Sequence, residues 1–264
     1  MTAGHLLLGD KVAVITGAGS GVGRASALRF AQEGAAVVCA DVREDWAQET
    51  VALVTDKGGR ALAHRCDVSV EDDVAGAVFA AVRTFGRLDV MFNNAGVTGM
   101  TPGMKFEDHT AEDFERLTGI NFRGVFHGCK HAVLRFKEQG DGGVIVNTGS
   151  VAGMVGWGSV VYGATKGAVN QLTRGVAIEC APFNIRVNAI CPAAMPHTNF
   201  ILCSPDAAFQ PKPEEEIAMM ASLHPLGRAI TAEDCAAAAA FLASDEAINI
   251  TGVLLPIDGG FVAR

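Results

Sequence analysis

The sequence predicts a single doubly wound α/β domain, and three observations support that fold class. Short, almost continuously apolar runs alternate with stretches of about ten or more residues of helical periodicity, which is typical of a parallel sheet covered on both faces. The 31 glycines, against 9 prolines and 1 tyrosine, favour many tight strand-to-helix turns over a β-sandwich. Finally, 49% of the 264 residues are hydrophobic, which is enough to bury one large core.

The predicted elements follow one another in a regular order. Residues 11–16 (KVAVIT) form a β-branched apolar strand, and a glycine-dense turn and a helix to Glu33 come next. The alternation continues through strand 36–40, a helix to residue 57, strand 61–66, helix 70–85, strand 88–92, helix 110–137, strand 143–148, helix 160–180, strand 185–190, an alanine-rich helix at 236–240 and strand 251–257. This order predicts one Rossmann-type parallel sheet with helices on both faces.

The regular pattern breaks between residues 193 and 228. This stretch contains prolines at 196, 205, 211 and 213 and many apolar side chains, among them Met195, Phe200, Leu202, Phe209, Met219 and Met220. Long irregular segments in compact domains usually have a function, so we expect a lid over the substrate. The acidic run 214–216 follows Pro213 and is typical of the first turn of a helix. Because no linker is visible, we expect residues 1–264 to form one domain.

Charge and hydropathy exclude several classes of partner. The net charge of −8 repels nucleic acids and anionic lipid surfaces. The longest apolar stretches, such as 235–243, are far shorter than the roughly 20 residues that span a bilayer. No basic segment precedes Leu6, so a signal peptide is not expected. The seven cysteines include no C-x-x-C pair, which favours reduced thiols, and we expect a cytoplasmic protein.

The turn after the first strand predicts a phosphate-binding site. Residues 16–23 read TGAGSGVG, and glycines allow the backbone to approach a pyrophosphate while the next helix offers N–H donors. The spacing G-x-x-x-G-x-G differs from G-x-G-x-x-G and lacks the Lys-Ser/Thr pair of a P-loop. We therefore expect a dinucleotide rather than ATP; a glycine turn without a ligand is the alternative.

Acidic residues at two strand ends extend this site. Asp41 closes the second strand, where its carboxylate can accept hydrogen bonds from the adenine ribose and would repel a 2′-phosphate. This favours NAD over NADP, although the nearby Arg43 keeps NADP open as an alternative. Asp67 and Val68 end the third strand similarly and are predicted to contact adenine.

Tyr162 and Lys166 give the sharpest chemical signal. Their i, i+4 spacing places both side chains on one face of a predicted helix. A free tyrosine has a pKa near 10, but an adjacent ammonium and a positively charged nicotinamide would favour the phenolate, making Tyr162 an acid/base group. In isolation the same pattern also fits an ordinary surface pair.

The whole chain resembles the short-chain dehydrogenase/reductase family. The motifs are TGAGSGVG at 16–23, NNAG at 93–96, GSVAG at 149–153, YGATK at 162–166 and ITGVLLPIDGG at 250–260. The resemblance implies that Tyr162 transfers the proton and that Lys166 holds the nicotinamide ribose. It further implies that Ser150 hydrogen-bonds the substrate oxygen and that Asn121 anchors a water in a proton relay.

The resemblance also implies the cofactor contacts and an assembly. The implied cofactor-binding residues are Gly17, Ser20, Gly21, Val22, Asp41, Asp67, Val68, Asn94, Tyr162, Lys166 and Thr198. The implied assembly is a homotetramer or a homodimer in which long helices pack between subunits. Two departures stand out: 12 positions separate Ser150 from Tyr162 where the family most often has 13, and Thr198 lies one residue late after Pro192.

The sequence does not predict a metal site. His197 lies between Cys191 and Cys203, but their spacing fits no common ligand set. His127 and His131 have the i, i+4 spacing of zinc-binding helices but no accompanying glutamate base or third ligand. We interpret this pair as helix surface or interface.

Together these features predict an NAD-dependent oxidoreductase that interconverts a secondary alcohol and a ketone. The apolar lid and Trp157 favour an apolar or cyclic small-molecule substrate. Two alternatives remain: an NADP-dependent ketone reductase that uses Arg43, and a dinucleotide-sensing protein without catalysis. The complete set of Asn121, Ser150, Tyr162 and Lys166 argues against a sensor, which has no need of a proton relay.

Overall fold

A computed structural model describes residues 6–99, 105–196 and 212–264. Its strands form one parallel seven-stranded sheet in the order β3-β2-β1-β4-β5-β6-β7. The strands are β1 (Val12–Thr16), β2 (Ala36–Asp41), β3 (Arg60–Arg65), β4 (Val90–Asn93), β5 (Gly143–Thr148), β6 (Ile185–Pro192) and β7 (Leu254–Ile257). The helices are α1 (Gly21–Gln32), α2 (Glu44–Thr55), α3 (Glu71–Phe85), α4 (Ala111–Thr118), α5 (Gly124–Gln139), α6 (Val160–Cys180), α7 (Glu214–Ser222) and α8 (Ala232–Ala243).

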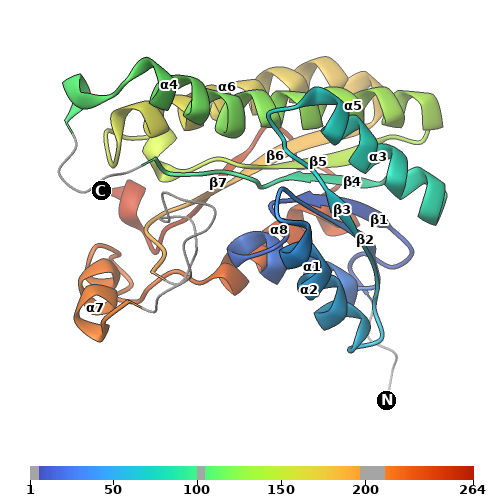
Figure 1. The fold of residues 1–264 in the computed structure, drawn as a ribbon, viewed down its shortest axis with the longest axis horizontal. Helices are drawn as coiled ribbons and strands as arrows, with labels where there is room; N and C mark the ends of the chain where they lie inside the picture. The colour runs from blue at the N-terminus through green and yellow to red at the C-terminus, as the bar shows by residue number, and fades with distance from the viewer. Residues whose placement is uncertain (1–5, 100–104, 197–211) are drawn as a thin grey trace.

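Helices cover both faces of the sheet, so the predicted doubly wound fold is confirmed. Helices α3, α5 and α6 pack on one face, while α1, α2 and α8 pack on the other (Figure 1). Every residue of β1 and β2 is buried, as expected for central strands of a sheet with two covered faces. Val12 and Val14 point into the first layer and Ala13 and Ile15 into the second, following the two-residue period of a strand.

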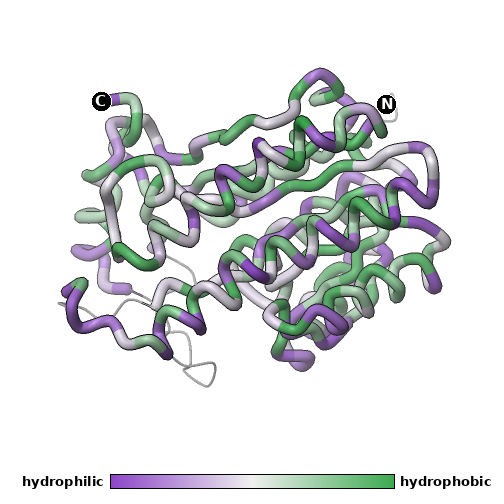
Figure 2. The backbone as a smooth tube through the Cα atoms, turned by 90° about the horizontal axis from the view of Figure 1, so that it is seen from above, coloured by the Kyte–Doolittle hydropathy of each residue, from purple (hydrophilic) through white to green (hydrophobic). Residues whose placement is uncertain are grey.

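The helices are amphipathic, as their sequence periodicity predicts. Hydrophobic and hydrophilic residues alternate along the helices (Figure 2), and the buried residues of α1, α3, α5 and α6 recur at helical spacing. The alanines of α8 allow it to pack closely beside α1, where Phe30 stacks on Phe92 with ring centroids 6.2 Å apart. Within the described chain, no helix combines the length and apolar character needed to cross a membrane.

The predicted helical segment over residues 110–137 is confirmed, but its middle is irregular. Helix α4, capped by the hydroxyl of Thr110, is separated from α5 by a π-helical turn, η2 (Gly119–Arg123). Such turns insert an extra residue into a helix and often mark functional sites. Asn121 lies in this turn and is fully buried, so the irregularity turns a polar side chain inward.

The strand order places the candidate site. It reverses between β1 and β4, and ligands of open α/β sheets bind beyond the carboxyl ends of the strands at such a switch point. The glycine turn and the ends of β4, β5 and β6 all meet at this edge. Of the predicted lid at 193–228, the described residues include α7; residues 197–211 lie outside the description.

Candidate active site

The glycine turn between β1 and α1 is tightly closed. Gly17 has a left-handed φ of +65°, and a Cβ on Gly23 would lie 2.0 Å from the carbonyl oxygen of Gly17. The N-cap residue Ser20 makes no side-chain capping bond, and the first turn of α1 contains no acidic residue. The first N–H groups of α1 and its positive dipole end therefore suit an anionic group such as a pyrophosphate.

Asp41 ties the end of β2 to this turn. Its Oδ2 accepts a hydrogen bond of 2.8 Å from the N–H of Gly19, and its Oδ1 accepts one of 2.9 Å from the N–H of Arg43. Burial raises the pKa of Asp41, and the two N–H donors act in the opposite direction. The carboxylate thus stands beside the predicted phosphate site.

Arg43 is engaged by its own neighbours. Its guanidinium forms an ion pair of 2.8 Å with Asp45 and lies 4.7 Å from the ring centroid of Trp46. Arg24, the other arginine near this turn, pairs with Glu49 at 2.9 Å. Both guanidinium groups therefore have a carboxylate partner before any phosphate approaches.

Asp67 and Val68 follow β3, as the sequence predicts. The N–H and the hydroxyl of Ser69 both donate to Asp67 Oδ1. Val68 is buried and packs against Gly124, where a Cβ would come within 2.7 Å of Val68 Cγ2. This contact places the third strand end beside α5.

The interpretation of the histidine pair as helix surface or interface is wrong for His127. This residue is only 6% exposed, and its Nδ1 lies 3.0 Å from the carbonyl oxygen of Val68, beneath α5. His131 lies 3.1 Å from Glu71 at the helix edge. The periodicity located both residues on one helix face but not the loop that covers His127. Among the described residues, no group of three or more His, Cys, Asp or Glu side chains is placed to hold a metal.

Asn94 connects three strand ends at the switch point. Its Nδ2 donates to the carbonyl of Thr16 at 3.1 Å, and its Oδ1 accepts from the hydroxyl of Thr148 at 3.2 Å. In turn, Thr16 Oγ1 accepts from the N–H groups of Asn94 and Ala95. These bonds fix β1, β4 and β5 together at the edge where the cofactor is predicted to bind.

Tyr162 and Lys166 lie near the start of α6 and are 8% and 1% exposed. Lys166 Nζ lies 5.8 Å from the centroid of the Tyr162 ring and donates a hydrogen bond of 2.7 Å to the carbonyl of Thr148. The two side chains therefore share a buried site, and the alternative of a surface pair is excluded. Sequence reasoning missed Thr148, although it directly precedes the GSVAG motif.

Ser150 reaches Tyr162 despite the short loop. The side chains of Ser150 and Tyr162 are hydrogen-bonded. Ser150 Oγ also accepts from the N–H of Ala152 at 3.1 Å and donates to the carbonyl of Pro192 at 3.3 Å. The 3₁₀ turn η3 (Val151–Gly153) begins directly after Ser150, and the chain enters α6 at Val160.

Burial dominates the ionisation of both groups. It raises the pKa of Tyr162 well above its usual value, while the hydrogen bond with Ser150 acts in the opposite direction. Burial lowers the pKa of Lys166 to about 8. The expected lowering of the Tyr162 pKa by the ammonium is not found in the protein without its cofactor, where burial is the dominant effect, and a phenolate needs further positive charge.

Asn121 lies next to this group. Its Oδ1 accepts from the N–H of Val97 and its Nδ2 donates to the carbonyl of Val97, both at 2.8 Å. Its Nδ2 is also 3.4 Å from Thr165 Oγ1, one residue before Lys166. The π-helical turn thereby connects the loop after β4 to α6. Thr198 lies outside the described residues, as do His197 and Cys203.

The loop between Ser150 and Tyr162 forms an apolar wall. Trp157 packs edge-on against Phe261, with ring centroids 5.6 Å apart, and Arg264 donates to the carbonyl of Leu223 just after α7. The C-terminal residues thus join the loop to the end of α7. A hollow of about 360 Å³ is lined by Ala152, Val155, Gly156, Trp157, Gly158, Ser159, Val160, Gly163 and Ala164.

Known proteins match the chain over nearly its whole length. A family model described as enoyl-(acyl carrier protein) reductase matches residues 17–262. Cyclohexanol dehydrogenase from Acinetobacter sp. (strain SE19) is 37% identical over 256 residues, which cover 97% of this chain and 96% of that protein. Levodione reductase from Leifsonia aquatica is 39% identical over 254 residues, covering 95% and 94% of the two chains.

Solved structures agree with these matches. The crystal structure of levodione reductase has a TM-score of 0.88 at 37% identity and covers 97% of this chain and 99% of its own. A 3-ketoacyl-(acyl-carrier-protein) reductase from Brucella melitensis, complexed with NADH, has a TM-score of 0.85 at 40% identity, with 96% and 99% covered. This chain belongs to the short-chain dehydrogenase/reductase family, whose members are oxidoreductases that use a nicotinamide cofactor.

Proposed function

We propose that this protein is an NAD-dependent oxidoreductase that interconverts a secondary alcohol and a ketone. The observation that carries the proposal is the buried group of Ser150, Tyr162 and Lys166 at the carboxyl edge of the sheet. A bound nicotinamide would take up or return the hydride. The glycine turn, Asp41 and Asn94 would hold the dinucleotide, with Asp67 and Val68 at the adenine end.

The side chains would handle the proton and the substrate oxygen. In the oxidation, Tyr162 as phenolate takes the hydroxyl proton while the carbinol carbon loses its hydride, and the C–O bond becomes a carbonyl. The Ser150 hydroxyl hydrogen-bonds the same oxygen. Burial raises the pKa of Tyr162, and the Lys166 ammonium together with the positive ring of a bound cofactor would supply the charge that lowers it. Asn121 would hold the water that returns the proton to solvent.

Cofactor choice is supported by charge at the end of β2. Asp41 stands beside the glycine turn, where a carboxylate accepts from ribose hydroxyls and repels a 2′-phosphate. Arg43 and Arg24 are already paired with Asp45 and Glu49, which weakens both as phosphate ligands. NADP-dependent reduction through Arg43 is the alternative.

The substrate we propose is apolar and cyclic. The wall formed by Val155, Trp157 and Val160 lines a hollow of about 360 Å³, and apolar pockets of this order of size suit small apolar ligands. Two relatives are named for their action on cyclohexanol, a cyclic secondary alcohol, and on levodione. Both lines of support point to a ring that carries a secondary alcohol or ketone.

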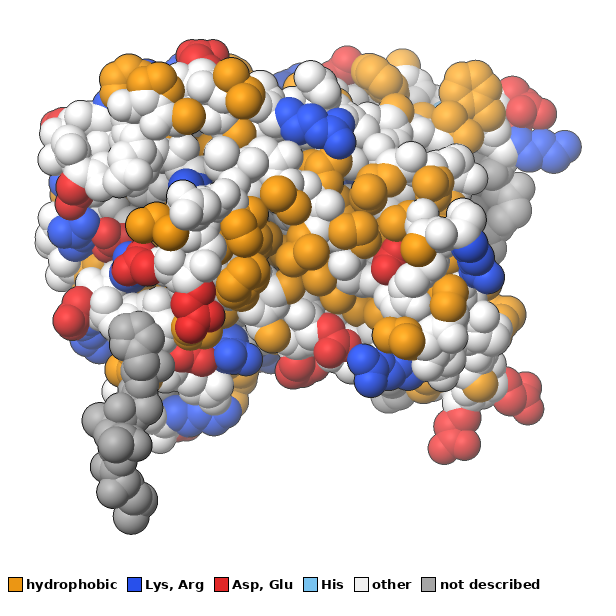
Figure 3. Space-filling model, turned by 180° about the vertical axis from the view of Figure 1, so that it is seen from behind, with side chains coloured by type: hydrophobic (Ala, Val, Ile, Leu, Met, Phe, Trp, Pro, Cys, Tyr) orange, Lys and Arg blue, Asp and Glu red, His pale blue; other side chains and the backbone are white. Residues whose placement is uncertain are grey.

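The active form we propose is a homo-oligomer, either a tetramer or a dimer. Helices α4, α5 and α6 leave large hydrophobic side chains exposed, including Phe114, Phe126, Leu134 and Ile178. Hydrophobic side chains also gather across the middle of the face seen from behind (Figure 3). Apolar surface of this extent supports burial between copies of the chain.

Replacement of Tyr162 by phenylalanine tests the proposed function. Turnover of cyclic secondary alcohols, followed as NADH absorbance, should fall about a thousandfold in Tyr162→Phe because the proton acceptor is lost. The dissociation constant for NADH should change less than about twofold, since the ring remains in place. Unchanged turnover in the variant would refute the mechanism. NADPH binding at least tenfold tighter than NADH binding would refute the NAD assignment and favour the NADP-dependent ketone reductase.

A further inference from the structure

Directly beneath Ser150 lies a buried pair that the proposed chemistry does not use. Cys191, near the end of β6, is fully buried, and Asn170 lies one helical turn after Lys166 on α6 and is 3% exposed. The thiol of Cys191 donates to Asn170 Oδ1 across 3.7 Å. The pair therefore links the last residues of β6 to the helix that holds Tyr162 and Lys166.

The backbone around Gly149 rests directly on this pair. A Cβ on Gly149 would lie 2.5 Å from Asn170 Oδ1 and 2.8 Å from Cys191 Sγ. The N–H of Gly149 donates to the carbonyl of Ile190 at 2.8 Å, and the N–H of Ser150 donates to the sulfur of Cys191. A side chain larger than that of glycine would not fit at position 149. The backbone of Gly149 and Ser150 is therefore held by β6, through the carbonyl of Ile190 and the thiol of Cys191.

The thiol is suited to holding rather than reacting. Burial raises the pKa of Cys191 to about 12, so the sulfur stays protonated and can both accept from Ser150 and donate to Asn170. Asn170 Nδ2 is buried with no hydrogen-bond partner among the described residues. A buried amide with one unpaired group costs stability. This cost is consistent with a role for the Asn170 oxygen, which accepts the hydrogen bond from Cys191.

We propose that Asn170 and Cys191 are positioning residues that fix Ser150 against Tyr162 through the backbone of Ser150. This inference rests on the proposed function, because Ser150 matters only where it meets the reacting oxygen. Neither residue touches the substrate. Their effect reaches the reaction through one hydrogen bond, between the side chains of Ser150 and Tyr162.

Tyr162 offers a direct readout because it is the only tyrosine in the chain. Protein labelled with ¹³C at tyrosine Cζ gives one resonance, whose shift reports the hydrogen bonding and ionisation of that phenol. It is recorded with and without NAD⁺, alongside steady-state kinetics. The variants are Cys191→Ala, Cys191→Ser, Asn170→Leu and Ser150→Ala, together with the double variant of Ser150 and Cys191 to alanine.

The proposal predicts a specific pattern. Cys191→Ala should lower kcat about tenfold and leave KM for NAD⁺ within about twofold, because a small displacement of Ser150 weakens only its bond to the reacting oxygen. The Tyr162 resonance should move toward its position in Ser150→Ala. Cys191→Ser, which keeps a donor and an acceptor, should recover most of the loss. In the Ser150→Ala background, the second change should cost less than about twofold.

Cys235→Ala is the matched control, because Cys235 is equally buried but lies on α8 and belongs to the opposite layer. It should leave the resonance and kcat unchanged. An unmoved Tyr162 resonance in both Cys191→Ala and Asn170→Leu, or a full tenfold loss in the Ser150→Ala background, would overturn the proposal. Absence of turnover in the parent protein would refute the proposed function instead, while the resonance would still test the pair.

Discussion

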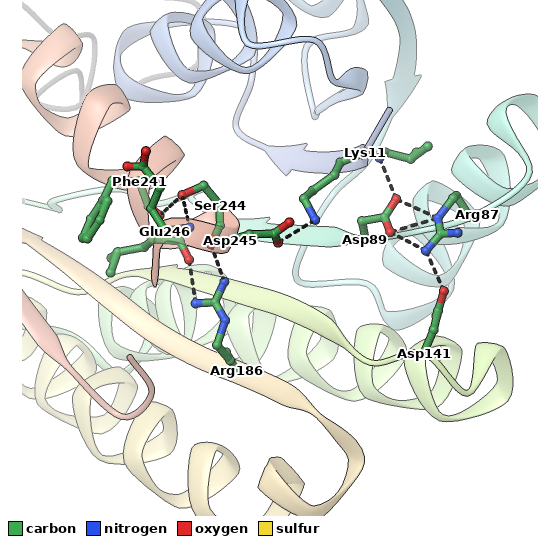
Figure 4. Close-up of polar contacts among 11 residues, drawn as sticks. Lys11, Arg87, Asp89, Asp141, Arg186, Phe241, Ser244, Asp245 and Glu246 are labelled. Atoms are coloured by element: carbon green, nitrogen blue, oxygen red, sulfur yellow. Dashed lines mark hydrogen bonds and ion pairs between the residues drawn. The ribbon is translucent and has the colours of Figure 1, made fainter. Parts of the chain in front are cut away.

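The two edges of the sheet are built from opposite kinds of chemistry. At the amino ends of the strands, Lys11 pairs with Asp245 at 2.9 Å, and Arg87 pairs with Asp89 at 2.6 Å and with Asp141 at 2.7 Å (Figure 4). Most of these side chains keep part of their surface in water. Each charge has a partner, so this edge holds the strands and helices together at little desolvation cost.

At the carboxyl ends, the polar group proposed for catalysis is buried without opposite charges. Lys166 is 1% exposed, and its ammonium donates to a neutral carbonyl rather than to a carboxylate. Burial raises the pKa of Tyr162 and lowers that of Lys166, so it favours the neutral form of both groups. Burial of these groups therefore lowers the free energy of unfolding. The comparison shows that the ion pairs of Lys11 and Arg87, which stabilise the fold, lie at the edge where no chemistry is proposed.

Replacement of Lys166 by methionine should have the largest effect on the contrast between the two edges. Turnover should fall at least about a hundredfold, because the proposed positive charge beside Tyr162 is lost. Stability at pH 7 should nevertheless rise by about 2 kcal/mol, since methionine removes a buried charge at the cost of one hydrogen bond. Thermal denaturation would show this as a higher Tm.

The pH dependence fixes the cause of that gain. Burial lowers the pKa of Lys166 to about 8 from an ordinary value of 10.5. Below pH 8 both the folded and the unfolded chain carry the charge, and the full penalty is present. Between pH 8 and 10.5 the folded chain loses its proton first, so the advantage of Lys166→Met should shrink there. An advantage that is constant from pH 7 to 10 would rule out burial of the charge as its origin.

Replacement of Arg186 by methionine tests the other edge. Arg186 lies at the start of β6 and donates to the carbonyl of Leu242, in the last turn of α8, at 2.8 Å and to that of Ser244, the residue after α8, at 2.9 Å. Loss of these bonds should lower the free energy of unfolding by about 2 kcal/mol, measured by urea denaturation. The kcat of the folded variant should stay within about twofold of the parent, and a tenfold fall would show that the two edges are not independent.

This contrast explains what could be predicted from the sequence. The glycine turn depends on residues adjacent in the chain, so TGAGSGVG, with a strand before it and a helix after it, predicted the turn between β1 and α1 directly. Tyr162 and Lys166 are also local, because one helix turn joins them. The family motifs extended this to Ser150 and Asn121, which the fold brings to the same edge.

Features that depend on packing between distant segments were not predictable in the same way. The π-helical turn at Asn121 exists where its amide meets the backbone of Val97, 24 residues earlier. His127 is buried against the loop between β3 and α3, where its Nδ1 meets the carbonyl of Val68. Desolvation sets the pKa of Tyr162, and no spacing of residues records how much water a folded site excludes.

The smallest predicted effect concerns Asp141, whose ion pair with Arg87 is about half exposed on both sides. Asp141→Asn should lower the free energy of unfolding by only about 0.5 kcal/mol at low salt, because solvent screens the pair. The guanidinium of Arg87 lowers the pKa of Asp141, so this contribution is present at neutral pH and lost as the pH falls through that lowered value. Urea denaturation in 1 M NaCl should erase the difference from the parent, whereas the deficit of Arg186→Met should persist because carbonyl hydrogen bonds at a partly buried site are not screened. If high salt erased the loss of stability in both variants, long-range charge alone would hold the amino edge. The distinction between its exposed ion pairs and the hydrogen bonds of Arg186 to backbone carbonyls would then fail.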